Sequence, residues 1–227
     1  MRTNRMLSLG LTAALSIAGL AAIVTAAPAV ARAHAASPAV ARARHPHACT
    51  ITGTAGDDVL DGTSGDDVIC GLRGNDFITG VAGDDIIRGG RGADVINGGK
   101  GADRLYGNRN NDTIRGDEGD DLVVGKRGND RLRGAKGDDT LKGGRGVDFV
   151  RGGADVDTIN GGQGDDDLAG GSDGDDVTGG TGSDLIVGWA GDDTLHGIDG
   201  VDGNDELRGS SGTDTCEADP GDSVSGC

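Results

Sequence analysis

The chain has 227 residues; 46 are Gly, only four are aromatic, and the formal net charge is −17. A mixed α/β enzyme or a helical bundle is excluded, because large apolar side chains are scarce and Gly at this density disfavours helix. Nucleic-acid binding is disfavoured as well, because the phosphate backbone repels so acidic a surface. The composition leaves either a disordered chain or a repeat protein held by something besides an apolar core.

Residues 1–26 have the pattern of a secretory signal peptide. Arg2 and Arg5 precede an apolar run of roughly 18 residues that ends at Val24, and small residues before Ala27 offer a cleavage site. A membrane anchor is the alternative, but the run is at the lower limit for spanning and is interrupted by Ser, Thr and Gly. We therefore expect a secreted, extracellular protein with no membrane span in its mature form.

Residues 27–48 are of low complexity, made of Ala, Pro, Arg and His, and are predicted to be a flexible linker or a trimmed pro-segment. Their three His residues do not predict a metal site, because the tract offers no fixed geometry. Removal of residues 1–48 takes away five Arg and no acid. Residues 49–227 therefore keep 16 basic and all 38 acidic residues, a formal charge of −22.

From Gly53 the sequence repeats every nine residues without a break to His196, and two further units begin at Gly200 and Gly209 after an insertion at 197–199. Counting each unit from its first Gly, position 1 is Gly and position 6 is Asp in all 18 units. Position 8 is Val, Ile or Leu in 17 of them, and position 4 is Gly in 15. The Gly content therefore reflects a repeated architecture and not a flexible linker.

Each unit is predicted to form a six-residue loop and a three-residue strand, with position 8 facing inward. Two units make one coil, so strands of every second unit stack in parallel. The three residues that replace Gly at position 4 are Asn110, Asp155 and Asp173. Asn and Asp are the other residue types that tolerate φ > 0, which agrees with a sharp turn at this position.

Asp at position 6 carries the predicted chemistry. Carboxylates stacked at strand spacing repel one another, and a cation between successive loops removes that objection. Calcium accepts six to eight oxygen ligands from carboxylates and backbone carbonyls, whereas zinc would require His and Cys clusters that are missing here. Ligation at Asp205 and Asp214 depends on the stack continuing past the insertion. The Asp residues at this position are Asp58, Asp67, Asp76, Asp85, Asp94, Asp103, Asp112, Asp121, Asp130, Asp139, Asp148, Asp157, Asp166, Asp175, Asp184, Asp193, Asp205 and Asp214.

The pattern over residues 53–217 resembles the RTX, or hemolysin-type, calcium-binding nonapeptide G-G-x-G-x-D-x-U-x. The resemblance implies an all-β fold, a right-handed parallel β-roll of about nine two-repeat coils over 49–217, with 218–227 as a C-terminal cap. It also implies that the eighteen position 6 Asp residues are metal ligands that bind multiple Ca²⁺ ions between neighbouring loops. Nine loops on each edge leave eight gaps, so roughly sixteen ions is the geometric ceiling. The thin core and the charge of −22 predict that folding is coupled to calcium binding. RTX toxins usually leave the cell by a C-terminal signal, whereas this chain is predicted to carry an N-terminal one. The transport route and toxicity of those proteins are therefore not carried over.

Four Cys residues allow three pairings, and the sequence alone does not choose among them. We expect Cys49–Cys70 and Cys216–Cys227, because each pair brackets one end of the array and solenoid ends need capping. A signal peptide implies an oxidising compartment in which disulfides persist.

Two surface patterns have open interpretations. Position 3 of odd-numbered units forms a ladder of Arg73, Arg91, Arg109, Arg127 and Arg145, and position 9 adds Arg115, Arg133 and Arg151, expected on the same side. The ladder is either a docking stripe for an anionic cell-surface glycan or charge balance for the loop Asp residues. Position 7 of the first five units is apolar: Val59, Val68, Phe77, Ile86 and Val95. These residues either form a strip that contacts a partner or the N-terminal segment, or they reflect the strand preference of β-branched residues.

The sequence thus predicts a secreted, non-enzymatic calcium-binding module with a structural or surface-adhesive role. One alternative is a polysaccharide-active solenoid, but the repeats hold only His196 and Tyr106 as candidates for catalysis besides the repeated acids. Another is an ice-binding solenoid, which would need a row of Thr at one position. Position 3 has Thr only at Thr181.

Overall fold

The computed structural model of the chain describes residues 31–34, 48–200 and 204–227. The predicted signal peptide lies outside these ranges. Every regular element within them is a β-strand. No helix in the described ranges is long and apolar enough to cross a membrane.

The strands follow one another at nearly constant intervals. Their bounds are β1 (Ala31–His34), β2 (Ile51–Thr52), β3 (Asp58–Asp61), β4 (Val68–Arg73), β5 (Phe77–Ala82), β6 (Ile86–Arg91), β7 (Val95–Lys100), β8 (Arg104–Arg109), β9 (Thr113–Glu118), β10 (Leu122–Arg127), β11 (Arg131–Lys136), β12 (Thr140–Arg145), β13 (Phe149–Ala154), β14 (Thr158–Gln163), β15 (Asp167–Ser172), β16 (Asp176–Thr181), β17 (Leu185–Ala190), β18 (Thr194–His196), β19 (Glu206–Ser211), β20 (Thr215–Glu217) and β21 (Ser223–Ser225).

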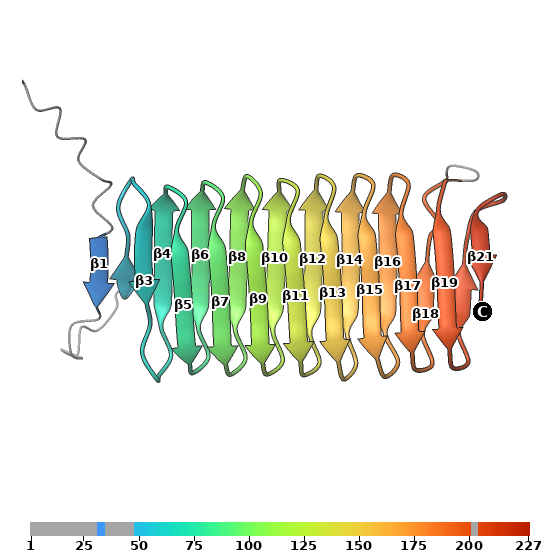
Figure 1. Cartoon of the computed structure of the whole chain (residues 1–227), viewed down its shortest axis with the longest axis horizontal. Helices are drawn as coiled ribbons and strands as arrows, with labels where there is room; N and C mark the ends of the chain where they lie inside the picture. The colour runs from blue at the N-terminus through green and yellow to red at the C-terminus, as the bar shows by residue number, and fades with distance from the viewer. Residues whose placement is uncertain (1–30, 35–47, 201–203) are drawn as a thin grey trace, which may run out of the picture.

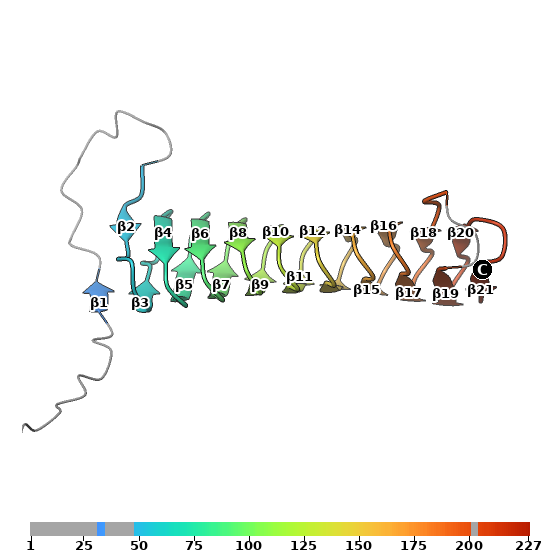
Figure 2. The ribbon, with the colours of Figure 1, turned by 90° about the horizontal axis from the view of Figure 1, so that it is seen from above.

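Two parallel sheets lie back to back along one long axis (Figures 1 and 2). The odd-numbered strands, β1 to β21, form an 11-stranded sheet, and the even-numbered strands, β2 to β20, form a 10-stranded sheet. Paired residues within the repeats are 18 apart, as in Leu132 opposite Val150. The predicted parallel β-solenoid of two-repeat coils is confirmed, with about ten turns.

The core is a double column of position 8 side chains, one from each unit. These side chains are fully or nearly fully buried from Leu60 to Leu207, and Ile51 extends the column at the N-terminal end. Cys216 in the last unit packs against the column while partly buried. A single aliphatic residue per nine positions is a thin core, so apolar burial holds this fold less firmly than an ordinary domain.

The strands are longer than the sequence predicted. Within the regular array, a strand covers positions 7 to 9 of one unit and positions 1 to 3 of the next, and the turn is only positions 4 to 6. In β10, for example, the strand runs through Gly125 to Arg127, which pairs with Arg145 on β12. The prediction of a six-residue loop was wrong because the residues at positions 2 and 3 still pair with those of the neighbouring coil. The strand therefore continues through position 1 and ends only at position 3.

Glycine is required at positions 1 and 4 for different reasons. A Cβ on Gly161, at position 1, would lie 2.5 Å from Asp166 Oδ2 and 2.6 Å from the carbonyl oxygen of Gly179, so packing excludes a side chain there. Position 4 instead requires a positive φ. The replacements Asn110 and Asp155 have φ of 74° and 75°, as their residue types predict.

Both ends of the solenoid are closed by disulfides, Cys49–Cys70 and Cys216–Cys227, which is the predicted pairing. At the N-terminal end, β1 lies within the segment predicted to be a linker, yet it pairs in parallel with β3. At the C-terminal end, β21 lies in the predicted cap and pairs with β19. Each cap therefore extends a sheet by one strand.

Candidate metal sites

Position 6 Asp residues form one ladder along each long edge of the solenoid. The Oδ1 atom of each Asp accepts a hydrogen bond from the backbone N–H of the position 6 Asp one coil earlier, as in Asp58 N to Asp76 Oδ1 at 2.9 Å. One edge carries Asp58, Asp76, Asp94, Asp112, Asp130, Asp148, Asp166, Asp184 and Asp205. The other edge carries Asp67, Asp85, Asp103, Asp121, Asp139, Asp157, Asp175, Asp193 and Asp214.

Both ladders continue past the insertion. Asp184 N donates to Asp205 Oδ1 at 2.8 Å, and Asp193 N donates to Asp214 Oδ1 at 3.0 Å, across 21 residues in place of 18. The three extra residues therefore do not interrupt the stack that was expected to depend on them. All the ladder Asp residues are buried except Asp214, which is half-buried.

The second carboxylate oxygen, Oδ2, is buried without a hydrogen-bond partner in sixteen of the eighteen Asp residues. These sixteen are Asp76, Asp85, Asp94, Asp103, Asp112, Asp121, Asp130, Asp139, Asp148, Asp157, Asp166, Asp175, Asp184, Asp193, Asp205 and Asp214. Burial of an ionised oxygen without a partner is costly, and native proteins pair such groups or use them to bind metals. Their number equals the number of gaps between neighbouring coils, eight on each edge.

The first Asp of each ladder differs from the rest. Oδ2 of Asp58 accepts hydrogen bonds from the backbone N–H of Thr54 at 2.5 Å and from its hydroxyl at 3.0 Å. Thr63 serves Asp67 in the same way, at 2.7 and 2.8 Å. Only the first two units have Thr at position 2. The sequence analysis did not distinguish Asp58 and Asp67 from the Asp residues that follow them, but the structure gives the Oδ2 atoms of these two a hydrogen-bond partner without a cation.

Burial raises the pKa values of the ladder carboxyls from Asp76 to Asp205. Desolvation is the largest cause, the backbone hydrogen bond to Oδ1 opposes it, and neighbouring ladder carboxylates add to it. The pKa is raised to about 8 at Asp112 and Asp157, and to about 7 at Asp103 and Asp166. At neutral pH the ladder therefore needs either protons or a cation to offset its charge.

Without metal, we expect the chain to gain β-structure as the pH falls from about 8 to about 5.5. The raised pKa of Asp112, for example, means that the folded state binds protons that the unfolded state has released. Stability from these groups is therefore full below their unfolded pKa and is lost as the pH rises through the folded values. Far-ultraviolet circular dichroism of metal-free protein checks this. A metal-free chain whose β signal is lost on acidification would contradict it.

A second, outer ladder runs along the same turns through position 5. The side-chain oxygen of Asp57 accepts from the N–H of Asn75 at 2.7 Å, and Asn129 accepts from Val147 at 3.1 Å. In the outer ladder each side chain accepts from the backbone of the next coil. In the inner ladder each side chain accepts from the backbone of the coil before it. Sequence reasoning missed this role, although Asp or Asn stands at position 5 in most units.

Asp222 in the C-terminal cap was also missed. Its Oδ1 accepts hydrogen bonds from Asn204 N at 3.0 Å and Asp205 N at 3.2 Å. It therefore continues the inner ladder by one step beyond the last odd-numbered unit. The signal in the sequence is the Asp two residues before Val224, the spacing of positions 6 and 8.

The donors at these edges suit a hard cation. An unpartnered carboxylate oxygen and a carbonyl of the next coil face the same side-chain-free side of a position 1 glycine, as Asp166 Oδ2 and Gly179 O do at Gly161. Within the described part of the chain, no three His, Cys, Asp or Glu side chains gather in a metal-holding group. An ion there would therefore draw on backbone carbonyls beside the Asp carboxylates, which calcium accepts and zinc does not favour.

A parallel solenoid whose turns present stacked, uncompensated carboxylates defines a metal-binding repeat protein. The family model of the RTX calcium-binding nonapeptide repeat matches overlapping segments that together cover most of the chain: 50–78, 79–114, 100–132, 115–150, 133–168, 143–177, 169–197 and 198–224. The chain belongs to this family, which implies calcium as its ion. Proteins with these repeats are typically secreted and the repeats are typically structural. No curated protein matches the chain.

His196 lies on the outer face of β18 between two carboxylates. Its Nδ1 is 3.0 Å from Glu217 Oε2, and its Nε2 is 3.4 Å from Asp176 Oδ1. In the described residues no Ser, Thr or Cys side chain hydrogen-bonds to this imidazole. The imidazole therefore contacts carboxylates of two other strands, Asp176 on β16 and Glu217 on β20.

The basic side chains divide between the two sheets. Arg73 pairs with Arg91 on the 10-stranded sheet, whereas Arg115 pairs with Arg133, and Arg133 with Arg151, on the 11-stranded sheet. Placing all of them on one side was wrong, because position 3 of an odd unit ends a strand begun by the unit before it.

The apolar strip at position 7 divides in the same way. Val59, Phe77 and Val95 lie on the 11-stranded sheet. Val68 and Ile86 lie on the other.

Proposed function

We propose that the protein is a secreted, non-enzymatic β-roll whose folding is coupled to calcium binding, with a structural or surface-adhesive role. The observation that carries this proposal is the set of sixteen buried, unpartnered Oδ2 atoms, one for every gap between coils. A divalent cation in each gap would offset the negative charge of the carboxylates that border the gap. It would also give Oδ2 the partner that it lacks.

The named Asp residues would act as the charged ligands, and the turn carbonyls would complete the coordination. When bound, calcium supplies charge neutralisation and links between adjacent coils. Asp58 and Asp67 would contribute less than the other sixteen, because Thr54 and Thr63 already occupy their Oδ2 atoms.

Two disulfides at the ends support an extracellular site of action, since such bonds persist in oxidising compartments. The signal peptide predicted at residues 1–26 supports secretion. A non-enzymatic role is supported by the repetition of the acids along the whole array, which suits structure better than a single active centre.

Equilibrium dialysis of the purified full-length chain against calcium tests the proposal. We expect saturation at close to sixteen ions, one per unpartnered Oδ2. Affinity should lie roughly in the 0.1–1 mM range of extracellular modules. Magnesium at the same concentrations serves as the control, because it demands near-ideal octahedral geometry and dehydrates reluctantly. Saturation at only one or two ions would contradict a repeated site.

A further inference from the structure

A shallow groove runs along the outer face of the 11-stranded sheet from β5 to β17. It consists of two stretches with volumes of about 490 and 410 Å³ that meet at Arg133. Glycine and other small residues of position 2, such as Gly153 and Gly171, form part of its floor on the second stretch. The two stretches share Arg133, so together their lining residues reach from β5 to β17.

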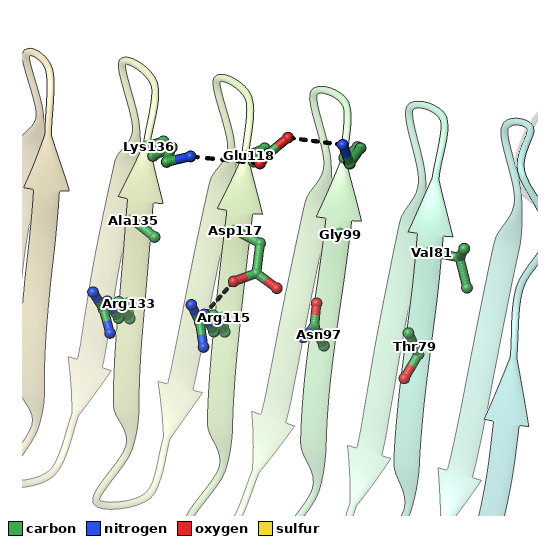
Figure 3. A pocket seen from close by; sticks show the side chains of 11 residues that line it. Thr79, Val81, Asn97, Gly99, Arg115, Asp117, Glu118, Arg133, Ala135 and Lys136 are labelled. Carbon is green, nitrogen blue, oxygen red and sulfur yellow. Dashed lines mark hydrogen bonds and ion pairs between the residues drawn. The ribbon is translucent and has the colours of Figure 1, made fainter.

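One wall of the groove is a row of position 9 side chains. Figure 3 shows the row passing from Thr79 through Asn97 to Arg115 and Arg133, and Arg151 continues it on β13. The side chain of Arg115 forms an ion pair with that of Asp117. Arg133 and Arg151 form no ion pair with any of the described residues, although residues 49–227 carry a formal charge of −22.

The opposite wall on the first stretch is basic as well. Glu118 lies 3.2 Å from Lys100 Nζ and 3.5 Å from Lys136 Nζ, so two lysines share one carboxylate (Figure 3).

Trp189 lies at the β17 end of the groove and lines the same stretch as Arg133 and Arg151. Its side chain is 57% exposed. Its φ of 80° is the conformation of position 2 throughout the array, as at Leu72 and Lys126, and Gly is the commonest residue there. The exposed indole returns little to stability, so an apolar aromatic surface is open at this end of the groove.

We infer that this groove binds a linear acidic polysaccharide through its carboxylate groups. Arg115 and Arg151 lie two strands apart, about 9.6 Å, with Arg133 between them. This spacing is close to the length of one disaccharide in an extended pyranose chain, so carboxylates on every second sugar can meet them. Guanidinium binds carboxylate with paired hydrogen bonds, and an exposed aromatic ring suits the apolar face of a sugar. The inference rests on the proposed function for its adhesive role, and it locates that role on the 11-stranded sheet and not on the Arg73–Arg145 ladder.

The test uses hyaluronan, a linear chain with a carboxylate on every second sugar, and the full-length protein in 5–10 mM calcium (on the order of extracellular concentrations or above). Affinity is measured by isothermal titration calorimetry, and folding by circular dichroism. The double variant Arg133→Ser plus Arg151→Ser should lose about tenfold or more in affinity. The matched control, Arg91→Ser plus Arg127→Ser, removes the same charge from the other sheet and should change affinity less than about twofold.

Trp189→Gly gives an independent readout. It restores the commonest residue at position 2, which adopts a positive φ freely, so the fold should be at least as stable while affinity for hyaluronan falls several-fold. A purely structural role for Trp189 would leave binding unchanged and overturn its part in the site.

A folded protein that does not bind hyaluronan, or an equal loss of binding in both arginine double variants, would overturn the groove. Equal binding of neutral dextran would also overturn it. Folding and hyaluronan binding in chelator would instead overturn the calcium dependence alone and leave the groove supported, so the two proposals fail separately.

Discussion

Chelation of calcium is expected to convert the protein from a β-solenoid to a largely unfolded chain, and millimolar calcium is expected to restore it. The metal-free ladder stacks buried carboxylates whose Oδ2 atoms have no partner, and sixteen such atoms recur along the two edges. At neutral pH their mutual repulsion opposes the folded state, and calcium binding then supplies folding free energy.

The core cannot compensate for this repulsion. Each nine-residue unit buries one aliphatic side chain, worth roughly 1.5–3 kcal/mol. The hydrogen-bonded ladders and the disulfides hold the coils in register, but the charge at the edges remains without an offset until a cation binds.

Circular dichroism of the full-length chain during a calcium titration, starting in chelator, measures this transition. A cooperative rise of the β signal near millimolar calcium is the expected result, with magnesium as the control. A chain that is folded throughout the titration would show that the ladder carboxyls are neutral or otherwise satisfied, and the coupling of folding to calcium would be rejected.

Asp139→Asn is expected to weaken the calcium-bound solenoid strongly, whereas Asp138→Asn is not. Asp139 is buried, and its Oδ1 accepts from Asp121 N at 2.8 Å while its Oδ2 has no partner. Asn can keep the acceptor oxygen Oδ1, but it loses the charge and replaces Oδ2 by an amide nitrogen that cannot bind a cation. Removal of one partner of a buried charge pair costs about 3–5 kcal/mol, and we expect a loss of this size in calcium.

Asp138 is the matched control because it adjoins Asp139 but is exposed in the outer ladder. Its Oδ1 accepts from Val156 N at 3.1 Å, a bond that Asn can keep, as Asn129 does with Val147. The change in unfolding free energy should stay within about 0.5 kcal/mol.

Thermal and urea unfolding in saturating calcium measure both variants, and calcium titrations give their midpoints. Equal effects of the two substitutions would mean that charge at position 6 has no special role. A normal calcium midpoint for Asp139→Asn would lead to the same conclusion.

The repeat itself predicted most of the fold. Gly at position 1 and an aliphatic residue at position 8 in register over eighteen units admit only an arrangement that stacks equivalent strands. The three substitutions at position 4 indicated a left-handed turn, and Asn110, Asp155 and Asp173 adopt it. The Asp column at position 6 was visible as well, since no local preference explains one residue type in every unit.

Other features depended on how the coils lie against one another. The sequence could not show that Thr54 and Thr63 satisfy the first two Asp residues, because those bonds depend on how each carboxylate turns within its loop. Nor could it assign Arg133 and Arg91 to different sheets. A nine-residue period fixes which positions stack. The point at which each strand ends decides on which of the two sheets a residue lies. The strands end two residues beyond the position 1 glycine because those two residues still pair with the backbone of the next coil.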